Sequence, residues 1–336
     1  MTSRTHLTII VPTLNEERYV ARTLICLSSD MNRFDYEILV VDGGSRDRTV
    51  AIVRDIAKGN PRIRLIHNEK RVQSAAVNLA VKLANPRSEV FIRADCHAEY
   101  PKNFVEVVYD ALLETGASSV VVPMTTIGAG CRQIAIAAAQ NSRLGNGGSL
   151  HRLGHKSLWV EHGHHAAFRR EVFVAVGGYD ESFTHNEDAE FDVRHLRAGG
   201  KIWMESKACL KYFPRGSFTQ LAKQYFKYGT GRAKNYCKHR QRLNFRQLLP
   251  VIVMLICAAS LIMSAFLPYF ILVPVLYVVA CLALGAMIGV QQRSLCAAGS
   301  GLAAVVMHMS WAIGFLTCLR FGRKAMNPFS NGSVSN

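Results

Sequence analysis

The chain has 336 residues and a formal net charge of +16 at pH 7, which is long enough for one large α/β domain plus an appended region. Its nine cysteines are odd in number and include no C-x-x-C pair, so they form neither a disulfide framework nor a zinc ribbon by pattern. Residues 248–290 and 295–319 contain no Asp, Glu, Lys or Arg.

A bilayer crossing needs about 20 apolar residues. The first uncharged run therefore predicts two membrane helices, with a turn near Leu267 and Pro268 or near Pro274, and the second run predicts a third. The other interpretation, a helical hairpin buried in a soluble core, is disfavoured because helices at the edge of such a core have a polar face and these segments have none.

Positive charge is concentrated just before the first apolar run, where residues 201–246 hold twelve Lys or Arg against one acid, Glu205. Such charge favours the cytoplasmic side of a membrane and attracts anionic lipid headgroups, so we expect a membrane and no nucleic acid as partner. Because the first residues do not resemble a secretory signal, we expect residues 1–246 in the cytoplasm and the chain in the inner (plasma) membrane. Three crossings would place Arg320 and the two cations after it outside, against the positive-inside tendency, so two and three spans both remain open.

Short apolar runs alternate with helical periodicity over residues 7–123. We expect strands at 7–13, 36–41, 63–67, 89–93 and 119–123, and helices at 18–27, 48–57, 74–83 and 103–114. This alternation predicts parallel βαβ units in a doubly wound α/β sheet, where ligands bind at the carboxyl ends of the strands. Acids follow three of the strands and no G-x-G-x-x-G motif opens the first helix, which argues against a nicotinamide-dependent dehydrogenase.

Three motifs stand at these strand ends, V-P-T-L-N-E-E at 11–17, V-V-D-G-G-S-R-D-R-T at 40–49 and R-A-D-C-H at 93–97, and a fourth, H-N-E-D-A-E-F-D, lies further along the chain at 185–192. In this order they resemble the family 2 glycosyltransferases, over roughly residues 6–235. The third motif, the Q-Y-F-K-Y-G-T-G-R stretch at 224–232 and the hydrophobic tail resemble more closely the succinoglycan-type exopolysaccharide glucosyltransferases.

The resemblance implies an inverting enzyme whose fold is GT-A, a Rossmann-like nucleotide-diphospho-sugar transferase domain. We expect this domain at 1–215, a basic amphipathic membrane-surface connector at 216–247, two or three transmembrane helices at 248–320 and a tail at 321–336.

The first two motifs and the start of the third are the candidate donor site. The implied donor-binding residues are Pro12, Thr13, Asn15, Glu16, Asp42, Gly43, Gly44, Arg93 and Ala94. A carboxylate such as Asp42 can accept a hydrogen bond from uracil or ribose, and glycines after it allow a close backbone approach. The same D-G-G-S run is also typical of a turn in which Ser45 caps a helix, and both roles can hold together.

Asp95 and His97 are the candidate metal ligands. Mg²⁺ or Mn²⁺ takes carboxylate, water and phosphate oxygens, so one or two protein ligands can hold it against a diphosphate. The family usually has Asp-x-Asp, whereas this chain has Arg93 at the first acidic position and His97 two residues beyond Asp95. Arg93 could contact phosphate or pair with Asp95, His97 could be a plain loop residue, and an imidazole ligand would suit Mn²⁺ better than Mg²⁺.

Glu187 and Asp188 are the candidate catalytic pair. Inverting transfer needs a carboxylate that takes the proton of the acceptor hydroxyl as its oxygen attacks the anomeric carbon. The resemblance assigns this role to Asp188, with Glu187 orienting the loop or the acceptor, and the G-G-Y-D-E run at 177–181 supports it. The two acids would also suit the N-terminus of an amphipathic helix at 189–196.

Four further residues are weaker candidates for diphosphate or acceptor contacts: His164, Gln224, Lys227 and Arg232. Histidines are frequent between 151 and 195, but their spacing does not resemble a zinc site. The stretch after Gln224 resembles the Q-x-x-R-W motif of processive synthases with Lys and Tyr replacing Arg and Trp, and it equally suits a membrane-surface helix at 218–236. Glycines at 145–148 and Gly154 predict a mobile loop that orders when donor binds.

These features together predict transfer from a nucleotide-sugar donor, UDP-glucose by resemblance, to a polyprenyl-diphosphate-linked saccharide in exopolysaccharide assembly, with a β-linked product. Two alternatives remain: a processive membrane polysaccharide synthase, and a non-catalytic membrane scaffold that keeps a sugar-nucleotide-binding fold. The departures at Arg93 and His97 favour the scaffold, whereas the short apolar tail disfavours the processive enzyme. A basic connector next to a membrane tail fits a lipid acceptor on physical grounds.

Overall fold

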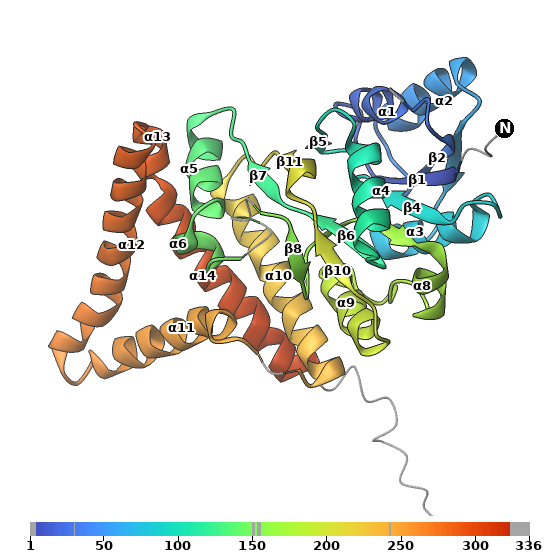
Figure 1. The fold of residues 1–336 in the computed structure, drawn as a ribbon. Coiled ribbons are helices and arrows are strands. Elements are labelled where there is room, and N and C mark those ends of the chain that lie inside the picture. The colour runs from blue at the N-terminus through green and yellow to red at the C-terminus, as the bar shows by residue number, and fades with distance from the viewer. Residues whose placement is uncertain (1–4, 30, 150–151, 153–155, 242, 323–336) are drawn as a thin grey trace, which may run out of the picture. The chain divides into compact units, whose positions relative to one another are not determined.

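The computed structural model describes residues 5–29, 31–149, 152, 156–241 and 243–322 (Figure 1). It contains two compact units, one formed by residues 1–125 with 150–213 and the other by residues 126–149 with 214–336. The domain boundaries expected from the sequence stay a prediction.

An eight-stranded mixed sheet forms the centre of the first unit, in the order β3-β2-β1-β4-β9-β6-β10-β8. Its strands are β1 (His6–Thr13), β2 (Asp35–Asp42), β3 (Ile63–His67), β4 (Val90–Arg93), β6 (Ser119–Val122), β8 (Leu158–Val160), β9 (His164–Arg169) and β10 (Ile202–Met204). The first four strands in this order are parallel, as the sequence predicted.

The sheet departs from the all-parallel prediction at two strands. β9 runs antiparallel between β4 and β6, and β8 runs antiparallel to β10. β8 and β9 lie beyond residue 123, where the alternation of strands and helices that predicted parallel units ends, so the sequence pattern did not reveal either strand. The antiparallel β9 brings its first residues to the edge of the sheet where β4 ends.

The helices of the first unit begin and end within two residues of the predicted bounds where a prediction was made. They are α1 (Val20–Ser28), α2 (Thr49–Gly59), α3 (Gln73–Leu83), α4 (Phe104–Thr115), α8 (Arg170–Ala175) and α9 (Glu187–Arg197), with the 3₁₀ turn η1 (Ser206–Ala208). Adjacent residues of β1 lie in different hydrophobic clusters, Ile9 on one face of the sheet and Ile10 on the other. Both faces are therefore buried, which explains why these strands are continuously apolar instead of alternating.

A second, three-stranded sheet has the order β5-β11-β7, made of β5 (Ala98–Glu99), β11 (Leu210–Tyr212) and β7 (Met124–Thr126). β5 lies directly after the R-A-D-C-H motif and pairs antiparallel with β11, with Lys211 opposite Glu99. This pairing fixes the chain that leaves the end of β4, which is where the candidate metal ligands stand.

The second unit is helical. Its elements are α5 (Cys131–Gln140), α6 (Arg143–Asn146), α10 (Phe218–His239), α11 (Phe245–Met263), η2 (Pro268–Ile271), α12 (Leu272–Gln291), α13 (Leu295–Ala298), α14 (Ser300–Thr317) and the π-helical η3 (Cys318–Gly322). Three segments are long and apolar enough to cross a membrane, Phe245–Met263, Pro268–Gln291 and Leu295–Phe321. These helices indicate membrane association, and the chain turns between the first two near Leu267, one of the two predicted places.

The glycine-rich loop predicted at 145–148 is only partly a loop. Gly145 lies inside α6, while Gly147 and Gly148 follow it with positive φ angles of 62° and 81°. Gly154 lies outside the described residues. The predicted ordering of this loop by donor stays a prediction.

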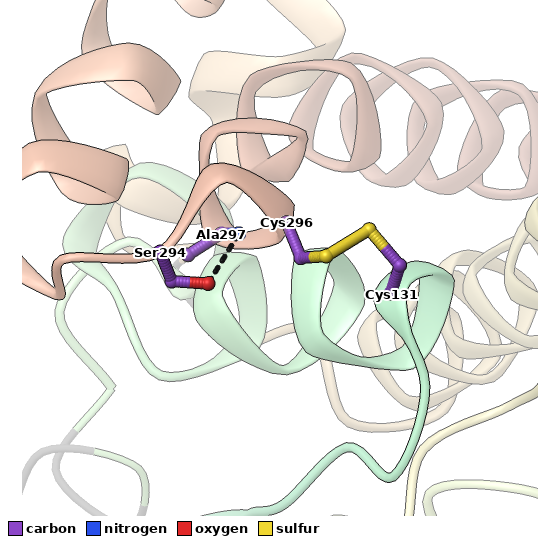
Figure 2. The surroundings of a disulfide bond; sticks show 4 residues. All are labelled: Cys131, Ser294, Cys296 and Ala297. Atoms are coloured by element: carbon purple, nitrogen blue, oxygen red, sulfur yellow. Dashed lines mark hydrogen bonds between the residues drawn. A yellow bond between two sulfur atoms is a disulfide. The ribbon is translucent and has the colours of Figure 1, made fainter.

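One cysteine pair departs from the expectation drawn from the scattered cysteines. Cys131, the first residue of α5, forms a disulfide with Cys296 of α13, with the two Cα atoms 4.9 Å apart (Figure 2). The partners are separated by 165 residues in the chain, so no local spacing could reveal the pair. The other seven cysteines are free thiols.

Candidate active site

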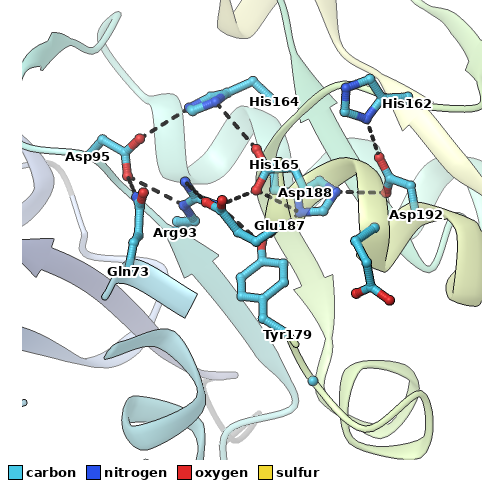
Figure 3. A network of polar contacts seen from close by, with 12 residues as sticks. Gln73, Arg93, Asp95, His162, His164, His165, Tyr179, Glu187, Asp188 and Asp192 are labelled. Carbon is cyan, nitrogen blue, oxygen red and sulfur yellow. Dashed lines mark hydrogen bonds and ion pairs between the residues drawn. The ribbon is translucent and has the colours of Figure 1, made fainter. Parts of the chain in front are cut away.

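Arg93 lies at the centre of a buried polar network in the first unit (Figure 3). It is the last residue of β4 and only 4% of its side chain is exposed. Its Nη1 donates to Asp188 Oδ1 at 2.6 Å, and its Nε lies 3.4 Å from Asp95 Oδ1. A third carboxylate, Glu187 Oε1, lies 3.6 Å from Nη2. The guanidinium thus brings together the acid of the third motif and the first two of the four acids of the fourth.

Asp95 is held from two further sides. Gln73 at the start of α3 donates from Nε2 to Asp95 Oδ1 at 2.7 Å. The second carboxylate oxygen, Oδ2, lies 3.7 Å from Nε2 of His164, whose Nδ1 is 4.0 Å from Asp188 Oδ2. His164 therefore lies between the two aspartates, as Figure 3 shows. Burial lowers the pKa of His164 to about 4, so its imidazole is neutral at pH 7.

A second histidine supports the same network from the opposite side. His165 is fully buried in β9, and its Nδ1 lies 2.6 Å from the Tyr179 hydroxyl and 3.7 Å from Asp188 Oδ1. Its Nε2 lies 2.7 Å from Asp192 Oδ1, one turn further along α9. Burial alone would lower the pKa of His165, but the Asp192 and Asp188 carboxylates outweigh it and raise that pKa.

Tyr179 reaches this network because its backbone is clamped. Asn78 of α3 accepts from the Tyr179 amide at 2.9 Å and donates to the Tyr179 carbonyl at 2.8 Å. The preceding Gly178 has a φ of +67°, and a Cβ there would lie 2.6 Å from Asn78 Oδ1. Only glycine fits this position without strain, which explains the second glycine of the G-G-Y-D-E run. The Tyr179 hydroxyl accepts from Arg93 Nη1 at 3.2 Å.

Glu187 and Asp188 open α9, where the helix dipole favours acids. Burial and the adjacent Asp188 charge raise the pKa of Glu187 to about 7, against the opposing effect of Arg93. Burial would raise the pKa of Asp188 as well, but Arg93 and the two histidines stabilise its anion and lower that pKa to about 2. The environment thus separates two adjacent carboxyls into one anion and one group that titrates near neutrality, a pattern found at acid–base sites.

The donor-site residues predicted from the first two motifs form a separate, interlocked pair of loops. Asp42 accepts from the amides of Gly44 and Ser45 at 2.8 and 3.0 Å and from the Ser45 hydroxyl at 2.5 Å. The Gly43 amide donates to the Thr13 carbonyl at 2.9 Å, joining the ends of β1 and β2. In this structure Asp42 therefore shapes the turn, a role that the sequence allowed beside nucleoside binding. The predicted helix cap by Ser45 is wrong, because α2 begins only at Thr49, with Arg48 as its N-cap, and the Ser45 hydroxyl donates to Asp42 instead.

Asn15 and Glu16 tie the same two loops together. Asn15 Oδ1 accepts from the Arg46 amide at 2.8 Å, and its own amide donates to Ser45 Oγ at 2.8 Å. The Glu16 side chain lies at the end of β4 instead, with Oε1 3.3 Å from His97 Nδ1. Pro12 is paired with Val41 inside the parallel ladder, and Ala94 donates its amide to the Ile10 carbonyl at 2.9 Å.

His97 differs from His164 in its surroundings. Its side chain is 43% exposed and its ring packs edge-on against Tyr212 at 5.7 Å between centroids. Gln224, Lys227 and Arg232 belong to α10 of the second unit, where Gln224 Nε2 donates to the Tyr228 hydroxyl at 2.9 Å.

Sequence reasoning missed several residues of the network. Gln73, Asn78, Tyr179, His165 and Asp192 carry its contacts, yet none was assigned a role. Two signals were available: Tyr179 stands inside the G-G-Y-D-E run, and His165 and Asp192 belong to the histidine-rich stretch and the fourth motif. Gln73 and Asn78 lie on a helix that carries no motif, so only the fold reveals them.

The carboxylates and imidazoles of this network are possible ligands of a divalent cation. Among the described residues, no three His, Cys, Asp or Glu side chains are arranged to hold a metal by themselves. Asp95 Oδ2 and the neutral His164 Nε2 are turned toward each other, and both are of the type that Mn²⁺ accepts. A cation here fits if the diphosphate and water supply its other ligands, as hard cations commonly require.

A mixed α/β sheet with carboxylates at the carboxyl ends of its strands is the pattern of a GT-A glycosyltransferase. Comparison with known proteins establishes this: the chain belongs to glycosyl transferase family 2, whose model matches residues 8–177. The model named glycosyl transferase family group 2 matches residues 124–290. The predicted GT-A fold, the predicted family and the prediction of a hexosyltransferase-class enzyme are confirmed.

Two relatives indicate how far the likeness extends. The chain is 45% identical over 308 residues to the succinoglycan biosynthesis protein ExoA of Rhizobium meliloti (strain 1021), covering 91% of this chain and 93% of ExoA. It is 27% identical over 267 residues to the dolichyl N-acetyl-alpha-D-glucosaminyl phosphate 3-beta-D-2,3-diacetamido-2,3-dideoxy-beta-D-glucuronosyltransferase of Methanococcus voltae, covering 73% of this chain and 77% of that protein.

Solved structures share the fold. The mannosyltransferase PcManGT from Pyrobaculum calidifontis, in complex with GDP-Man and Mn²⁺, superposes with a TM-score of 0.65 at 18% identity, covering 96% of this chain and 89% of that chain. GalNAc-T7, solved with UDP, GalNAc and Mn²⁺, gives a TM-score of 0.51 at 16% identity. The superposition covers 70% of this chain and 50% of the GalNAc-T7 chain. At these identities the likeness concerns the fold.

Proposed function

We propose that this protein is an inverting glycosyltransferase of exopolysaccharide biosynthesis, of the succinoglycan type. In this proposal it transfers glucose from UDP-glucose, in β linkage, to a polyprenyl-diphosphate-linked saccharide. The identity of 45% with a succinoglycan biosynthesis protein over nearly the whole chain supports the pathway. A dolichyl-phosphate-linked acceptor in the name of a second relative supports a lipid-linked acceptor.

The observation that carries the proposal is the junction of Asp95, Arg93 and Asp188. Asp95 follows a strand of the parallel part of the sheet, where a nucleoside diphosphate binds in such folds. Asp188 contacts the same guanidinium as Asp95, with its Oδ1 2.6 Å from Arg93 Nη1. In inverting transfer the attacking hydroxyl and the departing diphosphate lie on opposite sides of one anomeric carbon, and two carboxylates flanking one guanidinium suit these two positions.

In the proposed mechanism Asp188 is the general base. Its Oδ1 is held by Arg93, which leaves Oδ2 to take the proton as the acceptor oxygen forms the new bond to the anomeric carbon. The bond from that carbon to the diphosphate breaks on the opposite face, so the configuration inverts. Glu187, buried beside it, orients the loop or the acceptor.

Arg93 also offers positive charge where the diphosphate departs, and charge that develops in the transition state is stabilised most by groups already in place. We propose the donor site at the ends of β1, β2 and β4, formed by Pro12, Thr13, Asn15, Glu16, Asp42, Gly43, Gly44, Arg93 and Ala94. Weaker proposals for diphosphate or acceptor contacts are His164, Gln224, Lys227 and Arg232.

For the metal we propose Asp95 and His97 as protein ligands, with His164 as a further candidate beside Asp95. Bound there, Mg²⁺ or Mn²⁺ would neutralise the diphosphate and make it a better leaving group. Two structural relatives were solved with Mn²⁺, which supports a divalent cation without deciding between the two metals.

For the cellular setting we propose the inner membrane, with a cytoplasmic GT-A domain at residues 1–215 and a basic connector at 216–247. Nucleotide sugars are made in the cytoplasm, and the basic connector favours that side. This places the donor and the lipid-linked acceptor on the same face of the membrane.

The test uses membranes that contain the full-length protein, a panel of labelled nucleotide sugars and a lipid extract from cells lacking the protein. We expect one sugar, glucose, to enter a lipid-soluble product of one added residue. Membranes with Asp188→Asn serve as the matched control and should give none. A long polymer on one lipid would instead support a processive synthase. If no sugar were transferred and no donor were hydrolysed, the result would support the non-catalytic scaffold.

A further inference from the structure

Within the second unit, α10 and α14 lie side by side and run in the same direction (Figure 1). Leu221 near the start of α10 shares a hydrophobic cluster with Met307, and Ala233 near its end shares one with Phe315. Their backbones nearly touch between these points: a Cβ on Gly229 would lie 2.0 Å from the Trp311 carbonyl oxygen. The two helices therefore follow each other over most of their length.

The partner helix α10 is strongly basic along this shared stretch. It carries no acid and five cations, Lys223, Lys227, Arg232, Lys234 and Lys238. The tight packing means that α14 cannot cross a bilayer without taking the neighbouring turns of α10 with it. Cations in the hydrocarbon are costly and rare, and five on one helix are incompatible with a crossing.

The middle of α14 gives a second, independent argument. His308, halfway along the helix, has Nε2 2.8 Å from the Leu144 carbonyl oxygen of α6, while its Nδ1 lies 3.0 Å from the hydroxyl of Tyr277 in α12. α6 is a single turn that begins with Arg143 and ends at Asn146, with Gly147 as its C-cap. If α14 crossed, this charged, irregular backbone would lie at mid-membrane, where such backbone is tolerated only inside protein or beside water.

α11 and α12 behave differently from α14. Their most apolar windows are 11% buried within the protein, against 33% for the window containing α14, and they are also more hydrophobic, with mean hydropathies of 2.1 and 2.6 against 1.8. Charged residues stand at their outer ends only, Arg246 as the second residue of α11 and Arg293 just after α12, while the turn between them is uncharged. Such a pair can enter and leave a bilayer with both ends on one side.

We propose that α11 and α12 cross the membrane, whereas α14 lies with α10 in the membrane surface on the side from which α11 enters. The exposed lysines of α10, Lys223 and Lys227, then meet anionic lipid headgroups, and exposed apolar residues such as Ile313 enter the acyl boundary. Arg320 in η3, directly after α14, stays on the same side as Arg246. Two crossings thus remove the conflict with the positive-inside tendency that three crossings create.

The first test compares the two ends of the full-length chain in intact spheroplasts. One version carries an epitope tag before Met1, a second after Asn336 and a third between Leu267 and Pro268. We expect added protease to remove only the third tag, and all three after the membrane is lysed. Removal of the tag after Asn336, with the tag before Met1 protected, would establish three crossings and overturn the proposal. Protection of all three would overturn the crossing of α11 and α12.

A second test does not depend on tags. Ile313 in α14 and Leu282 in α12 are similarly exposed, 49% and 45%. We expect Ile313→Lys to leave the amount of membrane-integrated protein within two-fold of wild type, because a lysine at the surface can reach water. Leu282→Lys should lower that amount several-fold, because its lysine would lie in the hydrocarbon. An equal loss for both would contradict the surface position of α14. The test measures insertion and not catalysis, so its outcome is independent of the proposed reaction.

Discussion

Arg93 Nη1 lies 2.6 Å from Asp188 Oδ1, which joins the end of β4 to the first turn of α9. The motif to which Arg93 belongs normally begins with an acid in this family, so an arginine at this position suggested an incomplete metal site. The structure gives it a partner in each direction, Asp95 on one side and Glu187 with Asp188 on the other. The substitution therefore connects the proposed metal side of the site with the proposed catalytic side.

The first prediction concerns this guanidinium. Arg93→Ala leaves three buried carboxylates without their shared cation, and breaking a buried ion pair from one side costs about 3–5 kcal/mol. We expect a fall of that order in the free energy of unfolding, measured by denaturant titration of the detergent-solubilised protein. Arg33→Ala is the control, because Arg33 pairs with Asp110 on the surface and should cost about 1 kcal/mol or less. Equal costs would mean that Arg93 does not hold the network together.

The second prediction separates the two acids at the start of α9. Asp188→Asn keeps the shape of the side chain but removes the base, so transfer should fall by roughly 10²–10⁴-fold. Binding of the nucleotide sugar, followed by calorimetry, should persist, because Asp188 is proposed to act on the acceptor. Glu187→Gln should retain more activity than Asp188→Asn. The reverse order, with Asp188→Asn active, would transfer the role of base to Glu187, whose pKa of about 7 suits it.

The third prediction tests the clamp on Tyr179. Gly178→Ala places a Cβ 2.6 Å from Asn78 Oδ1 at a φ of +67°, and strain of this kind costs of order 1–3 kcal/mol. We expect a loss of stability of that size in thermal unfolding, with lower activity because Tyr179 supports Arg93. Gly59→Ala is the matched control, since a Cβ there meets nothing within 4 Å and φ is not positive. Unchanged stability of Gly178→Ala would show that the turn relaxes freely.

The fourth prediction concerns the disulfide of the second unit. Loss of a native disulfide typically costs about 2–5 kcal/mol, and more for a longer closed loop in the chain-entropy view. Cys131→Ser should therefore lower the unfolding temperature of the oxidised protein by several degrees, and a reductant should do the same to wild type. Cys237→Ser, which removes a free thiol, should have little effect. If reductant and Cys131→Ser both leave the unfolding temperature unchanged, the bond makes no contribution to stability.

The fifth prediction concerns the proposed cation. Chelation with EDTA should abolish transfer by wild-type membranes, and added Mn²⁺ or Mg²⁺ should restore it. Asp95→Asn should raise the metal concentration needed for half-maximal activity at least ten-fold, because one carboxylate supplies the main protein charge at the site. His97→Ala and His164→Ala, compared in the same titration, show which imidazole contributes. Full activity in EDTA would exclude an essential divalent cation.

The sequence alone determined the order of the main strands and helices from β1 to β6, over residues 7–123. The strands are buried on both faces, so they appear as unbroken apolar runs, and the helices between them have a strong period of 3.6 residues. The motifs at the ends of β1, β2 and β4 could be found because their residue types are tied to backbone geometry and charge, as at Gly43 and Asp95. Leu248 to Val290 could be assigned to membrane helices because charge is absent over its whole length.

Only the tertiary structure decided which of these residues meet. β9 enters the sheet antiparallel and brings His164 between Asp95 and Asp188 and His165 between Asp188 and Asp192, and no periodicity in the sequence encodes a pairing between distant strands. Gln73 joins the site from a helix without a motif, for the same reason. The role of α14 also depends on its neighbours, because its composition alone suits a membrane span and only its packing against the basic α10 indicates otherwise. Local composition determines what a segment can be, and contacts between distant segments determine which possibility has the lowest free energy.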